Sequence, residues 1–369
     1  MKSFVQRIWG LVILLLLTSG VCYADTLWKT ELDSILWAMD SVVFPEGEIV
    51  VVGYSEESEY TETETVLIYL DKYGTIINQT EVNEFPRNAY RKITIISVGE
   101  NLLLGRDFPL MINKDGDVLW AADWVEGNEI AALKYNKHIF VAEGTTLYCA
   151  DTDGTLIWKN DYALEENVRG RICTIEIAEN GDLLLAGYRT AKEVGNGSLE
   201  EVSHEEAMVG WVICTNEDGE IKWENIFTSS RLSDESYTCI AMDKQGAVYA
   251  AGTRNDGEGY SRGILRMFDS KTGKFLEEAA LEFEDFVRIG SFALGTDGQI
   301  IILGEMVGDG GDYAAIASII PGSVEYDNIV RVNHIESFPQ GQVDKEGMLV
   351  LSGRGRDSGT PVVIKFLYE

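Results

Sequence analysis

The sequence predicts an all-β fold built from one repeated unit, and two series of glycine-marked turns predict it. In the first series a glycine is followed by five mostly apolar residues and then by a second glycine. The copies are Gly47 to Gly53, Gly99 to Gly105, Gly181 to Gly187, Gly246 to Gly252, Gly298 to Gly304 and Gly347 to Gly353. Each copy indicates a tight turn that opens a short buried strand.

The second series places an acidic or amide residue shortly before a glycine, often with a tryptophan four residues after it. The copies are Asn113 to Gly116 with Trp120, Asp151 to Gly154 with Trp158, and Asn216 to Gly219 with Trp223, with weaker copies at Asp71 to Gly74 and Asp269 to Gly273. A side-chain oxygen that accepts backbone N–H groups, followed by a glycine at positive φ, makes a hairpin turn. Two hairpin turns give four strands per unit, and units of roughly 37 to 65 residues fit propeller blades.

The repeats place an inner strand in each of seven blades. These strands are expected near residues 38–44, 91–97, 129–135, 172–178, 236–242, 288–294 and 337–343, in blades that span approximately 37–82, 90–123, 128–162, 169–227, 235–281, 287–332, and 336–369 plus 25–33. The third blade has Lys137 and Glu143 where the two glycines should be, so we expect its turn to use another geometry.

The two ends of the chain predict how the ring closes. The last blade lacks one outer strand, whereas Thr26 to Leu32 resembles the tryptophan-bearing outer strands of the other blades. We therefore predict a single seven-bladed β-propeller, closed by pairing of the N-terminal strand with the C-terminal blade, which removes an exposed edge.

Residues 1–24 have the layout of a secretory signal peptide. Lys2 and Arg7 precede the apolar run from Ile8 to Leu17, and small residues lead to Ala24, after which we expect cleavage. The remaining residues 25–369 are expected to be secreted, periplasmic or part of the cell envelope, without a membrane span. Loss of two positive charges takes the formal charge from −31 to −33, which argues against nucleic acid as a partner.

Four cysteines follow the signal segment, at Cys149, Cys173, Cys214 and Cys239, all within apolar runs. Buried free thiols are the favoured interpretation, although an exported compartment permits a disulfide. The sequence leaves their disulfide state open.

The Asp-Gly turns with tryptophan and the apolar glycine-to-glycine strands resemble the bacterial propeller repeats classed with quinoprotein-like (PQQ-like) proteins. The resemblance covers residues 25–369. It implies the propeller architecture, whereas such repeats occur in quinone enzymes, in outer-membrane assembly scaffolds and in many exported proteins, so it assigns no activity.

No residue is predicted to be catalytic, to bind a metal or to hold a cofactor. His138, His204 and His334 fall in three different blades without a ligand partner at suitable spacing. Acidic turns such as Asp151 to Asp153 lack the donor series of a calcium loop. The tryptophan floor, calcium carboxylates and ring disulfide that the resemblance implies for a quinone enzyme find no match here.

Arginine and lysine separate between the two faces of the predicted propeller. Nearly all arginines fall in the loops before the inner strands or between the second and third strands, while lysines favour the opposite hairpin turns. The candidate ligand-binding residues are Arg91, Arg171, Arg288, Arg106, Arg189, Arg254 and Arg354. Two interpretations stay open: structural pairing with nearby acids, or a surface for an anion or acidic partner.

The sequence favours a non-enzymatic, monomeric binding or scaffolding module that recognises a protein or a carboxylate-bearing ligand. The alternatives are a quinone-dependent or glycan-acting enzyme, marked by paired carboxylates in the channel mouth, and a purely structural envelope component.

Overall fold

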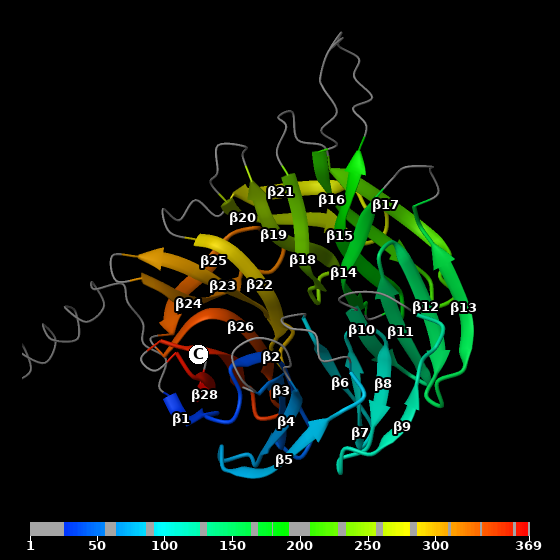
Figure 1. Cartoon of the computed structure of the whole chain (residues 1–369). Coiled ribbons are helices and arrows are strands. Elements are labelled where there is room, and N and C mark those ends of the chain that lie inside the picture. The colour runs from blue at the N-terminus through cyan, green and yellow to red at the C-terminus, as the bar shows by residue number, and fades with distance from the viewer. Residues whose placement is uncertain are drawn as a thin grey trace, which may run out of the picture.

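The computed structural model describes residues 26–55, 64–85, 92–125, 131–163, 169–178, 180–191, 207–227, 234–255, 261–280, 286–308, 311–332, 334–356 and 359–367. These residues form 28 strands and no helix. The strands make seven antiparallel four-stranded sheets, arranged as blades around a central axis (Figure 1). The predicted all-β, seven-bladed propeller is confirmed.

Each of the first four blades consists of four consecutive strands, ordered from the axis outward. Their bounds are β2 (Trp37–Val43), β3 (Ile49–Tyr54), β4 (Thr65–Leu70) and β5 (Ile76–Val82); β6 (Thr94–Val98), β7 (Asn101–Gly105), β8 (Pro109–Ile112) and β9 (Val118–Ala121); β10 (Ala131–Tyr135), β11 (His138–Glu143), β12 (Thr146–Asp151) and β13 (Leu156–Asp161); β14 (Gly170–Ile177), β15 (Leu183–Ala191), β16 (Ala207–Thr215) and β17 (Ile221–Phe227).

The fifth and sixth blades follow the same rule, and the seventh combines both ends of the chain. The bounds are β18 (Asp234–Met242), β19 (Ala247–Asn255), β20 (Ser261–Asp269) and β21 (Phe275–Ala280); β22 (Phe286–Leu294), β23 (Ile300–Gly308), β24 (Gly311–Ile319) and β25 (Tyr326–Val332); β26 (Ile335–Val343), β27 (Met348–Gly355), β28 (Pro361–Leu367) and β1 (Thr26–Glu31).

Ring closure occurs through β1, as the sequence predicts. This strand pairs antiparallel with β28, with Trp28 opposite Lys365 and Glu31 opposite Val362. Leu32 continues the contact, because its N–H donates to the carbonyl of Pro361 at 2.9 Å. The outer edge of β28 is therefore covered by the N-terminal strand.

The tryptophans of the outer strands hold neighbouring blades together. Trp120 of the second blade donates from Nε1 to the carbonyl of Thr152 in the third blade at 3.0 Å, and its ring covers the turn glycine Gly154. Trp28 and Trp223 make the corresponding bonds to Lys72 and Ser270. Because Trp28 joins the last blade to the first, the closure uses the same contact as the internal interfaces.

The hairpin turns satisfy their own backbone groups in the way that the sequence predicts. Asp151 Oδ1 accepts from the N–H groups of Asp153 and Thr155, and Gly154 has φ of +85°. Asn216 Oδ1 accepts likewise from Asp218 and Glu220. The acidic and amide residues of these turns are thus explained by hydrogen bonding.

The third blade makes its β10–β11 turn without a glycine, but the loop has the same two-residue length as the β6–β7 loop of the second blade, which begins with Gly99. The β10–β11 hairpin has a two-residue loop, because Tyr135 pairs directly with His138. Asn136 takes φ of +53°, the only positive φ recorded for a non-glycine residue among the described residues. Asparagine tolerates this left-handed conformation better than most residues, so it replaces the glycine.

The second glycine of the first series has a structural reason that the sequence did not reveal. Several inner strands contain a β-bulge, including β2 after Ala38, β14 after Ile172 and β18 after Tyr237. A Cβ on Gly187 would lie 1.8 Å from the carbonyl oxygen of Arg171, beside the bulge of β14. A Cβ on Gly53 would lie 2.3 Å from the carbonyl oxygen of Trp37, and one on Gly252 would lie 1.9 Å from that of Ser236. The glycine therefore admits the bulged inner strand.

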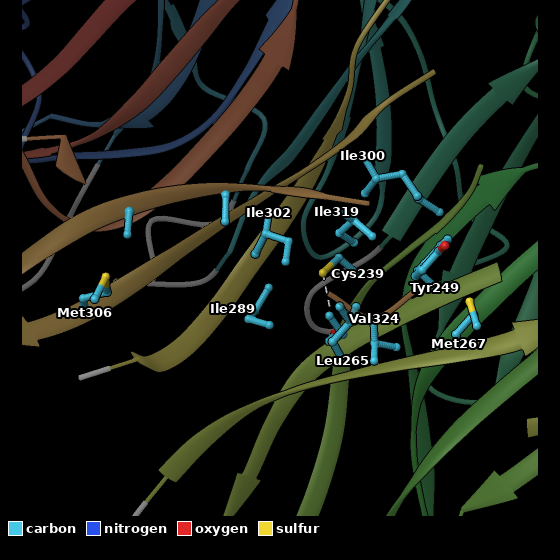
Figure 2. Close-up of a cluster of buried hydrophobic side chains, with 14 of the residues drawn as sticks. Cys239, Tyr249, Leu265, Met267, Ile289, Ile300, Ile302, Met306, Ile319 and Val324 are labelled. Carbon is cyan, nitrogen blue, oxygen red and sulfur yellow. Dashed lines mark hydrogen bonds between the residues drawn. The ribbon is translucent and has the colours of Figure 1, made fainter. Parts of the chain in front are cut away.

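The hydrophobic core consists of clusters between neighbouring blades. The cluster between the fifth and sixth blades packs Tyr249 and Leu265 against Ile302 and Ile319 (Figure 2). Equivalent clusters lie at each of the other six interfaces, including the one between the seventh blade and the first. The ring is thus bound together by burial at all seven interfaces.

Candidate functional site

The candidate arginines lie where the inner strands begin and where the second strands end. We call this end of the propeller the arginine face and the end with the glycine hairpins the turn face. Arg171 and Arg288 lie early in β14 and β22, and Arg189, Arg254 and Arg354 lie late in β15, β19 and β27. Arg91 lies outside the described residues.

Three candidates pack against aromatic rings. Arg106 is fully buried, with its guanidinium 5.3 Å from the ring of Tyr54 and its Nε 3.4 Å from Asp107 Oδ2. Arg189 lies over Trp211 at 5.8 Å and contacts Glu224 Oε1 at 3.3 Å. The guanidinium of Arg354 lies 5.1 Å from the ring of Trp37. Cation–π contacts of this kind hold the guanidinium groups in place.

Arg254 belongs to a buried ionic cluster in the fifth blade. Its Nε donates to Glu235 Oε1 at 2.6 Å, and its Nη2 donates to Glu278 Oε2 at 3.0 Å. Arg266, fully buried at the centre, donates from Nη1 to Glu235 Oε2 at 2.7 Å and to the Tyr237 hydroxyl, and from Nε to Glu278 Oε2 at 2.7 Å. Its guanidinium also stacks on Phe227 at 3.3 Å. Burial opposes ionisation of Glu278, but the two arginines outweigh it and lower the pKa of its carboxyl.

The arginine face also carries arginines whose side chains reach solvent. Arg169, Arg262 and Arg288 are exposed, and Arg171 is half-buried. Arg288 lies opposite Glu305 in the pairing of β22 with β23. The charge of Arg171 acts on Glu143 of the preceding blade, whose pKa burial nevertheless raises. Of the candidates, Arg171 and Arg288 are therefore better placed to contact a partner than Arg106 or Arg254.

A cavity of about 150 Å³ lies in the central channel, lined by residues from the innermost strands of all seven blades. Its polar lining combines both signs of charge, because Asp40 and Glu176 face it together with Lys92. Asp40 is held by two backbone N–H groups, from Ser41 at 2.8 Å and from Ile95 of the next blade at 3.0 Å. Glu176 accepts from the N–H of Ile177 at 3.0 Å.

Burial in the channel disfavours the charged form of both carboxyl groups. It raises the pKa of Asp40 to about 6, although the backbone bonds and the nearby Lys92 ammonium act in the other direction. It also raises the pKa of Glu176. The channel therefore holds two carboxyl groups whose ionisation depends on what lies beside them.

The four cysteines are all free. Cys149, Cys214 and Cys239 are buried, and burial raises the pKa of each thiol to about 12. Cys173 is half-buried and faces the channel cavity together with Cys239. The thiols of Cys149, Cys214 and Cys239 are therefore protonated at neutral pH and are poor nucleophiles.

The histidines have separate surroundings. His138 Nδ1 lies 2.9 Å from Glu217 Oε1, and His334 is half-buried, whereas His204 falls outside the described residues. Within the described part of the chain, no group of three or more His, Cys, Asp or Glu residues is arranged to hold a metal ion. The same residues include no helix long and apolar enough to cross a membrane.

The sequence did not single out the channel carboxyls or the Arg266 cluster. Asp40 follows a bulge that no local pattern marks, and Arg266 is placed away from the arginine face by its sequence position alone. The spacing of Glu235, Arg266 and Glu278 across three strands carries no periodic signal. Only the register of the sheet brings them together.

A family model described as outer membrane protein assembly factor BamB matches residues 110–290 of the chain. The match runs from β8 to β22 and confirms the resemblance to PQQ-like propeller repeats. No curated protein matches the chain in sequence.

Solved propeller structures resemble the whole ring at low sequence identity. Hydrazine synthase from Kuenenia stuttgartiensis is 11% identical with a TM-score of 0.59, covering 94% of this chain and 99% of that one. The Neurospora crassa Pan2 WD40 domain is 10% identical with a TM-score of 0.57, at 90% coverage of each chain. A Dyadobacter fermentans protein of unknown function is 10% identical with a TM-score of 0.57, covering 95% of this chain and 100% of that one. These likenesses concern the fold alone.

Proposed function

We propose that the chain is an exported, non-enzymatic propeller that acts as a protein-binding scaffold of the cell envelope. The observation that carries this proposal is the group of exposed arginines on one face of a rigid ring. The match to a model described as an outer-membrane assembly factor supports protein binding. The apolar run from Ile8 to Leu17 after Lys2 and Arg7 supports export.

The partner binds at the arginine face through carboxylate groups. Arg171 and Arg288 begin inner strands of nonadjacent blades, so a protein that contacts both must span the channel opening. A planar guanidinium can pair with a carboxylate through two parallel hydrogen bonds. Because the ring as a whole is strongly acidic, an acidic partner is attracted only where these arginines concentrate positive charge.

The test is affinity capture from the envelope fraction of the source cell with the full chain. The Arg171→Gln/Arg288→Gln variant should lose a partner that the unmodified protein retains. The matched control is Lys271→Gln/Lys345→Gln, which removes two exposed positive charges from the turn face. Capture of the same proteins by all three versions would overturn the proposal. Loss of the partner with both double variants would show an effect of net charge rather than of a surface.

A further inference from the structure

The channel cavity is lined by charged residues of both signs, as ligand-binding sites often are, and the proposed scaffold function does not involve it. Residues on the innermost strands of all seven blades face it, so it lies on the axis of the ring. At about 150 Å³ it is too large for a single water molecule and accommodates a molecule of roughly the bulk of benzene. A ligand held here is therefore small.

The carboxyl groups supply one half of the recognition chemistry. Asp40 comes from the first blade and Glu176 from the fourth. Backbone N–H groups of Ser41 and Ile95 fix both oxygens of Asp40, so its position needs no reorganisation when a ligand arrives. Burial raises the pKa of both carboxyl groups. A bound ammonium group would offset that cost by favouring the ionised form.

Lys92 supplies the other half. It precedes β6 at the end of the channel where the inner strands begin, and its side chain lines the same cavity. Burial raises the pKa of Asp40 and of Cys239, and the Lys92 ammonium is close enough to both groups to oppose part of that rise. Thr94, Thr174 and Ser291 also line the cavity. A negative ligand group near Lys92 would complete the pairing of charges.

We propose that the central channel binds a small zwitterion that carries one ammonium and one carboxylate group, such as a small free amino acid. Its ammonium pairs with Asp40, and its carboxylate pairs with the nearby Lys92, while Glu176 adds negative charge to the channel from the fourth blade. A simple cation leaves Lys92 unused, and a simple anion meets two carboxyl groups. The volume favours the small amino acids over the aromatic ones. Lys92 lies at the arginine-face end of the channel, so the site is adjacent to the proposed partner surface but uses none of its arginines.

The first experiment is isothermal titration calorimetry of the full chain at pH 7 with glycine, alanine, serine and threonine. Methylamine and acetate serve as probes that carry one charge each. At least one amino acid should bind at least tenfold more tightly than either probe. Equal binding of methylamine would replace the proposal with a cation site. No binding of any amino acid would overturn it.

Variants place the ligand within the channel. Lys92→Met and Asp40→Asn should each weaken amino acid binding at least tenfold, because each removes one charge partner. Lys92 is exposed, so its substitution should leave the melting temperature nearly unchanged and keeps the test valid if the Asp40 variant folds poorly. Lys271→Met on the turn face is the matched control and should bind like the unmodified chain. Unchanged binding by Lys92→Met would place the ligand elsewhere and overturn the proposal.

Proton release gives an independent readout. The titratable groups that line the cavity are Asp40, Glu176, Lys92, Cys173 and Cys239. If an ammonium group binds beside Asp40, part of the Asp40 population should lose its proton on binding near pH 6. Titrations at pH 6 in two buffers of different ionisation enthalpy should therefore differ in measured heat, and Asp40→Asn should reduce the difference. Identical heats in both buffers would contradict the assigned pairing.

Discussion

The two faces of the propeller are built by different rules. On the turn face one local solution recurs: a side-chain oxygen accepts backbone N–H groups, a glycine takes positive φ, and a neighbouring tryptophan covers it. On the arginine face each guanidinium has its own surroundings. Arg106 is buried beside Tyr54, Arg254 joins two glutamates, and Arg288 is exposed.

The repeat determines the role of each turn residue, whereas it does not determine the role of each arginine. The turn geometry follows from local sequence, so equivalent residues in different blades have equivalent roles. An arginine reaches several ångströms from its backbone, and its role depends on which side chains the sheet register brings near. One residue type on one face can therefore serve structure in one blade and binding in another.

The largest expected effect concerns the arginines of the fifth and sixth blades. Arg266→Ala removes one of the two arginines that pair with the buried Glu235, and breaking a buried pair in this way costs about 3–5 kcal/mol. Arg288→Ala, at an exposed position, should change the free energy of unfolding by no more than about 0.5 kcal/mol. Urea denaturation of both variants measures the contrast.

A second substitution checks the cause. Arg266→Met combined with Glu235→Leu removes both buried charges and should recover part of the loss. An Arg266→Ala variant as stable as Arg288→Ala would show that the cluster adds nothing to stability.

The turn glycines offer the next largest effect, because two of them, both at positive φ, differ in what an added Cβ would meet. Gly99 has φ of +66° with no atom within 4 Å of an added Cβ, whereas a Cβ on Gly154 would lie 2.6 Å from the Trp120 ring. Gly99→Ala should cost about 1–2 kcal/mol for the positive φ. Gly154→Ala should cost about twice as much, since the ring must also move. Equal melting temperatures would argue that the tryptophan contact is loose.

The turn face and the channel should also respond to pH with opposite signs. Burial opposes ionisation of Asp344 on the turn face. The Lys365 ammonium, whose Nζ lies 2.5 Å from Asp344 Oδ2, and two backbone N–H groups outweigh burial and lower the pKa of Asp344. Its stabilising contribution is therefore present above its ordinary pKa and is lost as pH falls through the lowered value. Asp40 in the channel has a pKa raised from 3.8 to about 6. The contribution of Asp40 to stability is fully present below pH 3.8 and is lost as pH rises through about 6.

Melting curves between pH 3 and pH 8 measure this contrast. Asp344→Asn should lower the melting temperature most at neutral pH and least in acid. Asp40→Asn should raise the melting temperature relative to the unmodified chain most above pH 6, and this gain should disappear in acid. The same pH trend in both variants would contradict the assigned causes.

The sequence predicts the features that depend on local geometry. Asp151 and Gly154 mark their turn because a side-chain acceptor and a glycine at positive φ are what this turn requires, and Trp28 identifies the closing strand through its likeness to the other outer strands. The bulge that requires Gly187 was not predicted, because the clash involves a carbonyl on a different strand. The channel position of Asp40 follows from such a bulge. The candidate arginines were assigned to a face, but their partners arise from contacts between strands far apart in sequence.

The smallest effects should show whether the turn face truly repeats one solution. Trp120→Phe and Trp223→Phe each remove one hydrogen bond to a neighbouring blade, at 3.0 and 2.7 Å, while keeping an aromatic ring on the turn glycine. Each should cost about 1 kcal/mol, the typical net value of such a bond. Because the two tryptophans lie at different blade interfaces, their costs should add in the double variant. Arg189→Gln and Arg354→Gln, which remove cations from the rings of Trp211 and Trp37, should instead differ from each other, since the two guanidinium groups have different surroundings and Arg189 gives up an ion pair with Glu224. Unequal tryptophan costs alongside equal arginine costs in urea denaturation would reverse the distinction between the faces, because the repeat would then specify the arginine contacts and not the turns.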